Sequence, residues 1–345
     1  MSITRRGLAA LATAAAFPAL AGAPKKPLII GHRGASGLRP EHTMLSYRLA
    51  IEQGADFIEP DLVMTKDRHF IVRHENEISG ATNIAAHPEF AARKTTKIVD
   101  SQKITGWFTE DFDLAELMTL RARERLPQLR PESARFDGQA PLVTYQEVID
   151  LAKSESRRLG RTIGTYPEMK HPTYFAGLGM PMERMLADVL KANDLNSPTA
   201  PVFVQCFEVG ALKTFMTLSK APRIFLMDSA GGPFDGKASY ADLARDMKVI
   251  AAFATGVGPN WSMVVPTVDG ALGPPTSLVA DAHAAGLSVH PWTVRAENFF
   301  LPKALQSNAN PAEHGDVTAV YKALFASGID GLFSDFPGLA AQARG

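Results

Sequence analysis

Two histidines stand where apolar runs of the sequence end. His32 closes the run 27–32 and is followed directly by Arg33, and His74 closes a second run in the stretch "HFIVRHENEISG". Imidazole titrates close to neutral pH, so two histidines that meet at one bond can act as general acid and general base. A neighbouring guanidinium can hold an anionic group such as a phosphate. These residues therefore predict proton-transfer chemistry beside an anion.

Two further apolar runs each carry a pair of charged residues spaced by two. These pairs are Glu59-x-Asp61 and Glu168-x-Lys170. Side chains two apart on a strand point to the same face, so each pair shares one face. Carboxylates packed on a dry face repel one another unless a cation binds between them. Turning the pairs outward, toward covering helices, would place the charges in an equally dry layer.

The composition of this acidic set indicates which cation it would hold. The three carboxylates of Glu59, Asp61 and Glu168 offer only oxygen ligands, which suit Ca²⁺ or Mg²⁺ better than zinc. A bound divalent cation, together with Arg33 and Lys170, could hold and polarise a phosphate group. The sequence thus predicts a metal-assisted site for a phosphate ester.

The elements that must position these residues are eight strand-like runs, which alternate with helix-like segments. Such alternation indicates a parallel sheet, and eight strands close a barrel. We therefore expect an α/β fold of the (β/α)₈ TIM-barrel type, over residues 27–345. A doubly wound open sheet is the rival, but "GHRGAS" is not its glycine-rich turn. The predicted strands are 27–32, 56–63, 162–170, 201–207, 223–228, 253–261, 287–294 and 330–336.

One long segment interrupts this rhythm after the second strand. Residues from 75 to about 140 are too many for a structureless loop, so they predict an inserted subdomain over one barrel mouth. We interpret its Arg121, Arg123 and Arg125 as a solvated charged face rather than a phosphate site.

Composition narrows the class of protein. Hydrophobic residues make up 46% of the 345 residues and charged residues 21%, as in a globular domain with a full core. The formal net charge is zero, which disfavours a nucleic-acid binder. The single cysteine, Cys206, excludes an intramolecular disulfide and is expected to be buried and inert.

The first residues have the pattern of an export signal. Arg5 and Arg6 precede an alanine-rich apolar stretch and then small residues, so residues 1–23 predict a signal peptide of the twin-arginine type. Cleavage after Ala21 would fit this pattern. We therefore expect a periplasmic or secreted protein without stable membrane insertion, because an uncleaved anchor would need a longer apolar run than one broken by Pro18.

Seven segments of the chain, from about residue 28 to 338, resemble the glycerophosphodiester phosphodiesterase family and its exported bacterial branch. They occur in the family's order: "GHRGASGLRPEHT", "GADFIEPDLVMTKD", "VRHENEISG", "YPEMKHP", "VQCF", "PWTV" and "GIDGLFSDFP". The resemblance implies a barrel and a divalent cation, calcium in the exported branch. It also implies hydrolysis of glycerophosphodiesters to sn-glycerol 3-phosphate and an alcohol.

By position, the resemblance also assigns the site residues. It implies His32 and His74 as the catalytic pair, Glu59, Asp61 and Glu168 as metal ligands, and Arg33 and Lys170 as phosphate contacts. The family's usual Pro-Glu-Asn-Thr is Pro-Glu-His-Thr here, with His42, and its usual His-Asp is His74-Glu75. Both departures are expected to reshape the pocket rim and affect the choice of substrate.

Aromatic residues end two of the predicted strands. We expect Trp292 and Phe207 to face the barrel mouth and cover the glycerol or alcohol end of the substrate, with ordinary core packing as the alternative for Phe207. The remaining histidines considered are read as structural: His87, His171, His283 and His314.

Two other functions compete with this hypothesis. A phospholipase D of the sphingomyelinase D type shares the two-histidine, three-carboxylate plan, but no basic amphipathic helix for lipid docking stands out. A non-catalytic barrel that binds phosphate esters would predict a broken catalytic set. The sequence leaves the oligomeric state and the substrate's alcohol group open.

Overall fold

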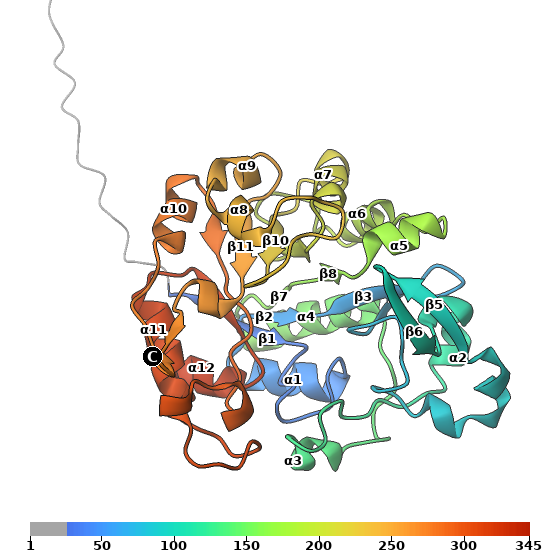
Figure 1. Cartoon of the computed structure of the whole chain (residues 1–345). Coiled ribbons are helices and arrows are strands. Elements are labelled where there is room, and N and C mark those ends of the chain that lie inside the picture. Colours follow the sequence, from blue (N-terminus) through green and yellow to red (C-terminus); the bar gives the residue numbers. More distant parts are fainter. Residues whose placement is uncertain (1–25) are drawn as a thin grey trace, which may run out of the picture.

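Parallel strands form the centre of the molecule in the computed structural model, which describes residues 26–345 (Figure 1). Two of the eight barrel strands are each divided into two short pieces: β2 continues as β3, and β7 continues as β8. The strands are β1 (Leu28–His32), β2 (Phe57–Glu59), β3 (Asp61–Met64), β7 (Gly164–Thr165), β8 (Glu168–Met169), β9 (Val204–Cys206), β10 (Arg223–Met227), β11 (Gly256–Pro259), β14 (Ser288–Val289) and β15 (Gly331–Ser334).

Hydrogen bonds close these strands into a ring. One sheet has the order β15-β1-β2-β7 and the other runs from β14 through β11, β10, β9 and β8 to β3. The divided strands join the two sheets on one side, since Pro60 interrupts the second strand without ending it. On the other side, the Val294 amide donates to the Phe333 carbonyl and the Phe333 amide donates to the Pro291 carbonyl, both at 2.9 Å. The predicted eight-stranded barrel is confirmed.

Helices cover the outside of this ring (Figure 1). The predicted capping box is present at the start of one of them, where Thr144 and Glu147 cap each other's backbone amides, and Gly160 ends that helix at φ 65°. The helices are α1 (Met44–Glu52), α4 (Tyr145–Leu159), α5 (Pro172–Gly177), α6 (Met182–Ala192), α7 (Val209–Leu218), α8 (Tyr240–Ala244), α9 (Met247–Ala251), α10 (Leu278–Ala284), α11 (Val317–Ala326) and α12 (Pro337–Arg344).

A small cluster of buried side chains fills the barrel interior. Phe57, Tyr166 and Phe333 pack there with two isoleucines, and the Tyr166 hydroxyl hydrogen-bonds His290 Nδ1 at 2.8 Å. Gly164 is required beside this cluster, because a Cβ there would lie 2.0 Å from the Phe57 ring. The interior is therefore closed by packed aromatic rings.

The insertion forms its own short elements beside the barrel (Figure 1). The antiparallel strand β4 (Phe70–Val72) leads into it from β3. It contains a hairpin of β5 (Thr95–Val99) and β6 (Gln102–Gly106), whose two-residue turn has positive φ at Asp100 and Ser101. Its helices are α2 (Leu114–Leu117) and α3 (Pro131–Ala134).

The remaining short elements lie in the connections. They are the strands β12 (Thr267–Val268) and β13 (Ala271–Leu272) and the 3₁₀ turns Ile84–Ala86, Pro88–Arg93, Thr109–Asp111, Trp261–Met263, Asn298–Phe300 and Lys303–Leu305.

The arginines of the insertion differ from one another. Arg123 is largely exposed, as expected, and Arg121 donates to backbone carbonyls including that of Leu120. Arg125 is also exposed, as expected, and its Nε lies 3.3 Å from a carboxylate oxygen of Glu41. A fourth arginine, Arg130, is buried and reaches the barrel. The insertion is therefore ion-paired to the barrel mouth.

The predicted signal peptide, residues 1–23, lies outside the described residues. From Lys26 onward, no helix combines the length and the apolar character that crossing a membrane requires.

Candidate active site

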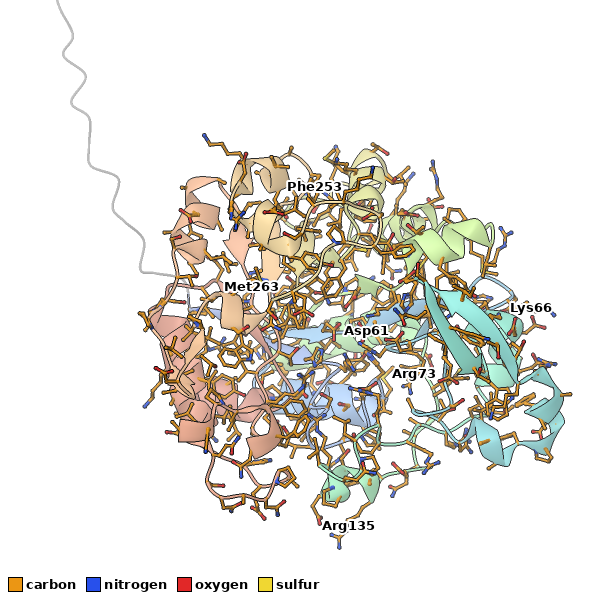
Figure 2. All side chains as sticks on the ribbon, viewed as in Figure 1. Asp61, Lys66, Arg73, Arg135, Phe253 and Met263 are labelled. Atoms are coloured by element: carbon orange, nitrogen blue, oxygen red, sulfur yellow. The ribbon has the colours of Figure 1, made fainter. Side chains whose placement is uncertain are left out.

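A pocket of about 150 Å³ opens at the C-terminal ends of the barrel strands. In barrels of this type, that end carries the functional residues. Eight of the nine residues predicted for the site line the pocket: His32, Arg33, Glu59, His74, Glu168, Lys170, Phe207 and Trp292. The ninth residue, Asp61, lies beside this pocket in the interior of the molecule (Figure 2). Arg135 of the insertion, by contrast, points outward to solvent.

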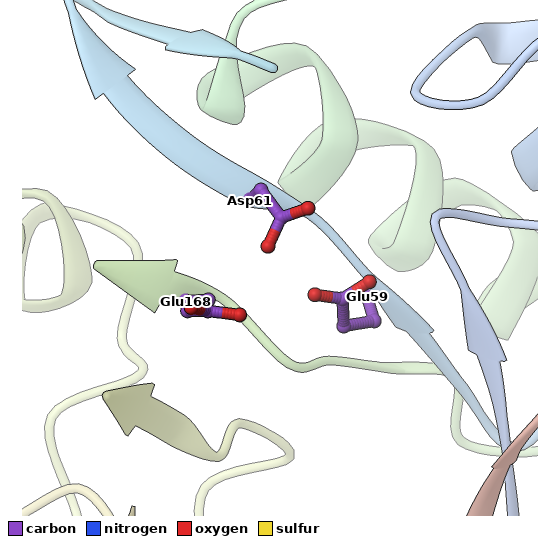
Figure 3. Close-up of side chains that lie close together, drawn as sticks. All are labelled: Glu59, Asp61 and Glu168. Carbon is purple, nitrogen blue, oxygen red and sulfur yellow. The ribbon is translucent and has the colours of Figure 1, made fainter. Parts of the chain in front are cut away.

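Three carboxylates converge in this pocket, as predicted. Glu59 and Asp61 extend from the divided second strand, and Glu168 extends from the neighbouring strand, where it pairs in register with Asp61 (Figure 3). Each of the three residues has one carboxylate oxygen that lies within 4.8 Å of the corresponding oxygens of the other two. All three side chains are buried.

The electrostatics of the three carboxylates fit a bound cation. Burial and the charge of Asp61 raise the pKa of Glu59 well above its usual range. Burial also raises the pKa of Glu168 to about 8. Burial alone would raise the pKa of Asp61 too, but Arg33 and His42 hold it well below its usual range. Without a cation, the set is thus too crowded for all three charges, and its oxygen-only donors suit a hard divalent ion.

The buried side-chain amide of Gln205 lies beside the three carboxylates. Gln205 Nε2 donates to Glu59 Oε1 at 3.0 Å, while the Gln205 side-chain oxygen is buried without a partner among the described residues. Gln205 is not among the site residues predicted from the sequence, although it lies within the segment "VQCF".

His32 is held by a buried network. Its Nδ1 lies 2.6 Å from Asp335 Oδ1, and the other oxygen of Asp335 accepts hydrogen bonds from Arg295 and Arg130. The pairing of β1 with β15 brings these residues together, although they are 303 positions apart in the sequence. Burial and the charge of Arg33 lower the pKa of His32 to about 4. The ring is therefore neutral at neutral pH, with Nδ1–H donated to Asp335 and Nε2 left for chemistry.

His74 is held in the same way by the insertion. Its Nδ1 lies 2.9 Å from one oxygen of Glu75, and the other oxygen of Glu75 lies 2.9 Å from His171 Nε2. Burial, Arg33 and Lys170 lower the pKa of His74 to about 3. Both histidines therefore present Nε2 on the walls of one pocket.

His171, which we expected to be structural, belongs to the network that holds His74. Its Nδ1 hydrogen-bonds Asp100 at the tip of the hairpin, and it links that tip to Glu75. Although burial opposes it, these two carboxylates raise the pKa of His171 to about 9, so it is a cation at neutral pH. Its position directly after Lys170, at the end of a barrel strand, was the signal available in the sequence.

The two predicted phosphate contacts lie next to the predicted metal ligands. The Arg33 amide donates to Glu59 at 2.8 Å, and its guanidinium contacts Glu41 at 2.8 Å and Asp61 at 3.2 Å. Lys170 Nζ lies 3.2 Å from Glu168. Arg33 has a left-handed backbone, with φ 60°, which is a strained conformation often found at functional sites.

His42, which replaces the asparagine usual in the family, lies beneath the site and not at its rim. His42 is fully buried, and its Nε2 lies 2.8 Å from Asp61 while its Nδ1 lies 2.9 Å from the Tyr47 hydroxyl. Arg73 fixes this segment by donating to the carbonyls of Glu41 and His42. The expected change to the rim is therefore wrong for His42, which supports a metal-site carboxylate from behind.

Both predicted aromatic residues stand on the pocket wall. The Phe207 and Trp292 rings pack edge to face with centroids 5.5 Å apart. The indole N–H of Trp292 donates to the Gly258 carbonyl at 2.7 Å, which fixes the ring. Core packing alone does not describe Phe207, because it also lines the pocket.

Known proteins with similar sequences share one activity in their names. Over 328 residues the chain is 35% identical to a glycerophosphodiester phosphodiesterase of Arabidopsis thaliana, covering 91% of this chain and 84% of that protein. It is 29% identical to a glycerophosphodiester phosphodiesterase of Haemophilus influenzae, covering 90% and 87%.

Solved structures share the fold. A putative glycerophosphoryl diester phosphodiesterase of Silicibacter pomeroyi matches with a TM-score of 0.65 at 20% identity, covering 94% of each chain. A phosphodiesterase of Oleispira antarctica, solved with the product sn-glycerol 3-phosphate, matches with a TM-score of 0.58 at 20% identity, covering 92% of this chain and 96% of that one. The model of the glycerophosphoryl diester phosphodiesterase family matches residues 32–339, and the chain belongs to that family.

Proposed function

We propose that this chain hydrolyses glycerophosphodiesters to sn-glycerol 3-phosphate and an alcohol, with a divalent cation. The observation that carries the proposal is the pair His32 and His74. Each has its Nδ1 held by a carboxylate, and both line the pocket that holds the three-carboxylate set. The named activity of the sequence relatives and the product in the Oleispira antarctica structure support it.

The residues divide the work as follows. Arg33 and Lys170 bind the phosphate oxygens of the substrate, and Phe207 and Trp292 cover its glycerol or alcohol end. Glu59, Asp61 and Glu168 hold the cation, which when bound polarises the phosphate group.

The proton transfers require that one histidine is neutral while the other is protonated. His32 takes the proton from the glycerol 2-hydroxyl, whose oxygen bonds to phosphorus and gives a cyclic phosphate. His74 donates its proton to the leaving alcohol oxygen as the P–O bond breaks. Water then opens the ring, with the two histidines in reversed roles.

The choice of His74 as the acid follows from its surroundings. Its pKa is lowered by burial and by the charges of Arg33 and Lys170. Arg33 acts in the same way on His32, but Lys170 is a cause of the shift for His74 alone. The negative phosphate of the substrate offsets the charge of Lys170, so substrate binding favours protonation of His74. The His74 side chain is also the more open of the pair, 27% exposed against 11% for His32.

We further propose Ca²⁺ as the cation, with Mg²⁺ as the alternative, because all three metal ligands are carboxylate oxygens.

We also propose that the protein is exported to the periplasm or medium through the twin-arginine signal. Fractionation of cells that express the chain with and without Arg5→Lys and Arg6→Lys tests it, and an unchanged location would contradict it.

The activity is tested with glycerophosphocholine and sphingomyelin in chelator, Ca²⁺ and Mg²⁺. Release of sn-glycerol 3-phosphate from the first, dependent on the cation, is the expected result. Release of the headgroup from sphingomyelin instead would favour the phospholipase D type. Absence of hydrolysis of every diester under all metals would leave only the binding barrel.

A further inference from the structure

A second hollow, which we call the side pocket, adjoins the catalytic pocket. It has a volume of about 330 Å³ and shares Glu168, Lys170 and Phe207 with the catalytic pocket. Its other walls carry carboxylates and aromatic rings: Asp100, Glu208, Phe234 and Tyr240. It lies on the His74 side, because its lining includes the His171 and Asp100 of the network that holds His74. A group leaving from the phosphate near His74 would therefore enter it.

Glu208 places an uncompensated carboxylate in this wall. The residue is only 4% exposed, and its Oε2 accepts hydrogen bonds from the amide and hydroxyl of Thr173. Within residues 26–345, no hydrogen bond reaches its Oε1 and no ion pair includes it. Burial, together with the negative charges of Asp100 and Asp235, raises the pKa of Glu208 to about 7. A ligand cation would supply a positive partner.

The cations of the same wall already have partners. Lys170 faces Glu168 at 3.2 Å, and His171 lies between Glu75 and Asp100. Asp100 gives one oxygen to His171, and its Oδ1 is buried with no hydrogen-bond partner among the described residues. Within the described residues, this wall therefore keeps a Glu208 carboxylate without an ion pair and an Asp100 oxygen without a hydrogen bond.

Aromatic rings complete the wall. Phe207 and Tyr240 pack edge to face with centroids 6.2 Å apart. Phe234 stands at the opening and is 46% exposed, which is unusual for so large an apolar side chain. Aromatic faces attract ammonium groups, most strongly where water is excluded.

We propose that the side pocket binds the alcohol portion of the substrate and selects an alcohol that carries an ammonium group. The proposal rests on the proposed function, because it assigns the leaving group of the same reaction. Glu208 and Asp100 supply the charge, and Phe207, Tyr240 and Phe234 supply the aromatic faces. An alcohol with a second hydroxyl or a carboxylate in place of the ammonium gains neither the ion pair nor the cation–π contact.

The test compares two diesters that differ only in the alcohol. The ratio of kcat/KM for glycerophosphocholine to that for glycerophosphoglycerol is measured in the full chain with saturating cation. Glu208→Gln keeps the size of the side chain and should lower this ratio about tenfold, mainly through KM for glycerophosphocholine. The matched control is Glu155→Gln, a buried carboxylate of α4 outside both pockets, which should leave the ratio unchanged. An unchanged ratio in Glu208→Gln would overturn the proposal.

A binding measurement separates this inference from the proposed function. Calorimetric titration of the His32→Ala/His74→Ala double variant with each diester reports affinity without turnover. Tighter binding of glycerophosphocholine, lost in a triple variant with Glu208→Gln, supports the side pocket even if neither diester is hydrolysed. Equal affinity for the two diesters overturns it even if both are hydrolysed.

Discussion

On one side of the catalytic pocket His32 is held by Asp335 at the end of β15, and on the other side His74 is held by Glu75 of the insertion. Asp335 is buried and paired with two arginines, Arg130 and Arg295. Glu75 is 40% exposed and shares His171 with the tip of a hairpin. The same chemical arrangement is therefore built once from barrel strands and once from a peripheral insertion.

The difference separates the rigid part of the site from its adjustable part. The His32 side depends on strand pairing, which fixes the backbone on both residues. The His74 side depends on the ion pairs of Glu75, whose side chain is 40% exposed, and solvent-exposed ion pairs are individually weak. We expect the His74 side of the pocket to adapt to the leaving alcohol while the His32 side stays constant.

Removal of the cation should have the largest effect, since both histidines act on a phosphate that the cation polarises. Chelation should abolish turnover, and Ca²⁺ or Mg²⁺ should restore it. Glu168→Gln should lose most of the affinity for the cation in a calorimetric titration, because it removes one of three ligands. Full activity in excess chelator would contradict the three-carboxylate site.

The histidines themselves come next. His32→Ala and His74→Ala should each lower kcat by about a hundredfold or more, the usual range for general acid and base catalysis. The double variant should cost little beyond the worse single change, because the two groups act as a unit. The pH profile of the native chain should be bell-shaped. Calcium affinity should survive both changes, and its loss in either would make that histidine a ligand.

The two holding carboxylates test the comparison directly. Asp335→Asn should lower kcat about tenfold to a hundredfold, as when the carboxylate behind a functional histidine is lost. Glu75→Gln should cost less, because the Glu75 side chain is 40% exposed whereas Asp335 is buried. The measurement is kcat with a pH profile, since a positioning residue shifts the profile whereas a purely structural one does not. A larger loss in Glu75→Gln would reverse our assignment of rigid and adjustable sides.

Acid sensitivity gives the smallest expected effect and reports on the His32 side. Because its pKa is about 4 in the folded chain and about 6.5 when unfolded, the unfolded state takes up the proton first as the pH falls. Stability is therefore lost on acidification through this window, by about 2 kcal/mol between pH 7 and pH 5. Urea unfolding of the native chain and His32→Gln at both pH values measures it. Equal pH dependence in the two proteins would show that His32 is not buried as a neutral ring.

The sequence by itself determined the fold class and most of the catalytic pocket. Its alternating runs predicted the eight strands, because periodicity is a local property. The Glu59-x-Asp61 spacing places both carboxylates on one face of a strand whatever the rest of the chain does. The ends of the runs located His32 and both aromatic residues, since strand ends meet at one mouth in a barrel. His74 also ends an apolar run, but that run forms β4, an antiparallel strand beside the ring.

Only the tertiary structure decided which groups hold these residues. Asp335 meets His32 because the last strand closes the ring against the first, a contact across 303 positions that no local pattern encodes. His171 becomes a cation because the hairpin tip brings Asp100 against it. The uncompensated charge of Glu208 likewise depends on what surrounds it. A residue type is set by the sequence, but its partners, burial and pKa are set by the elements that pack around it.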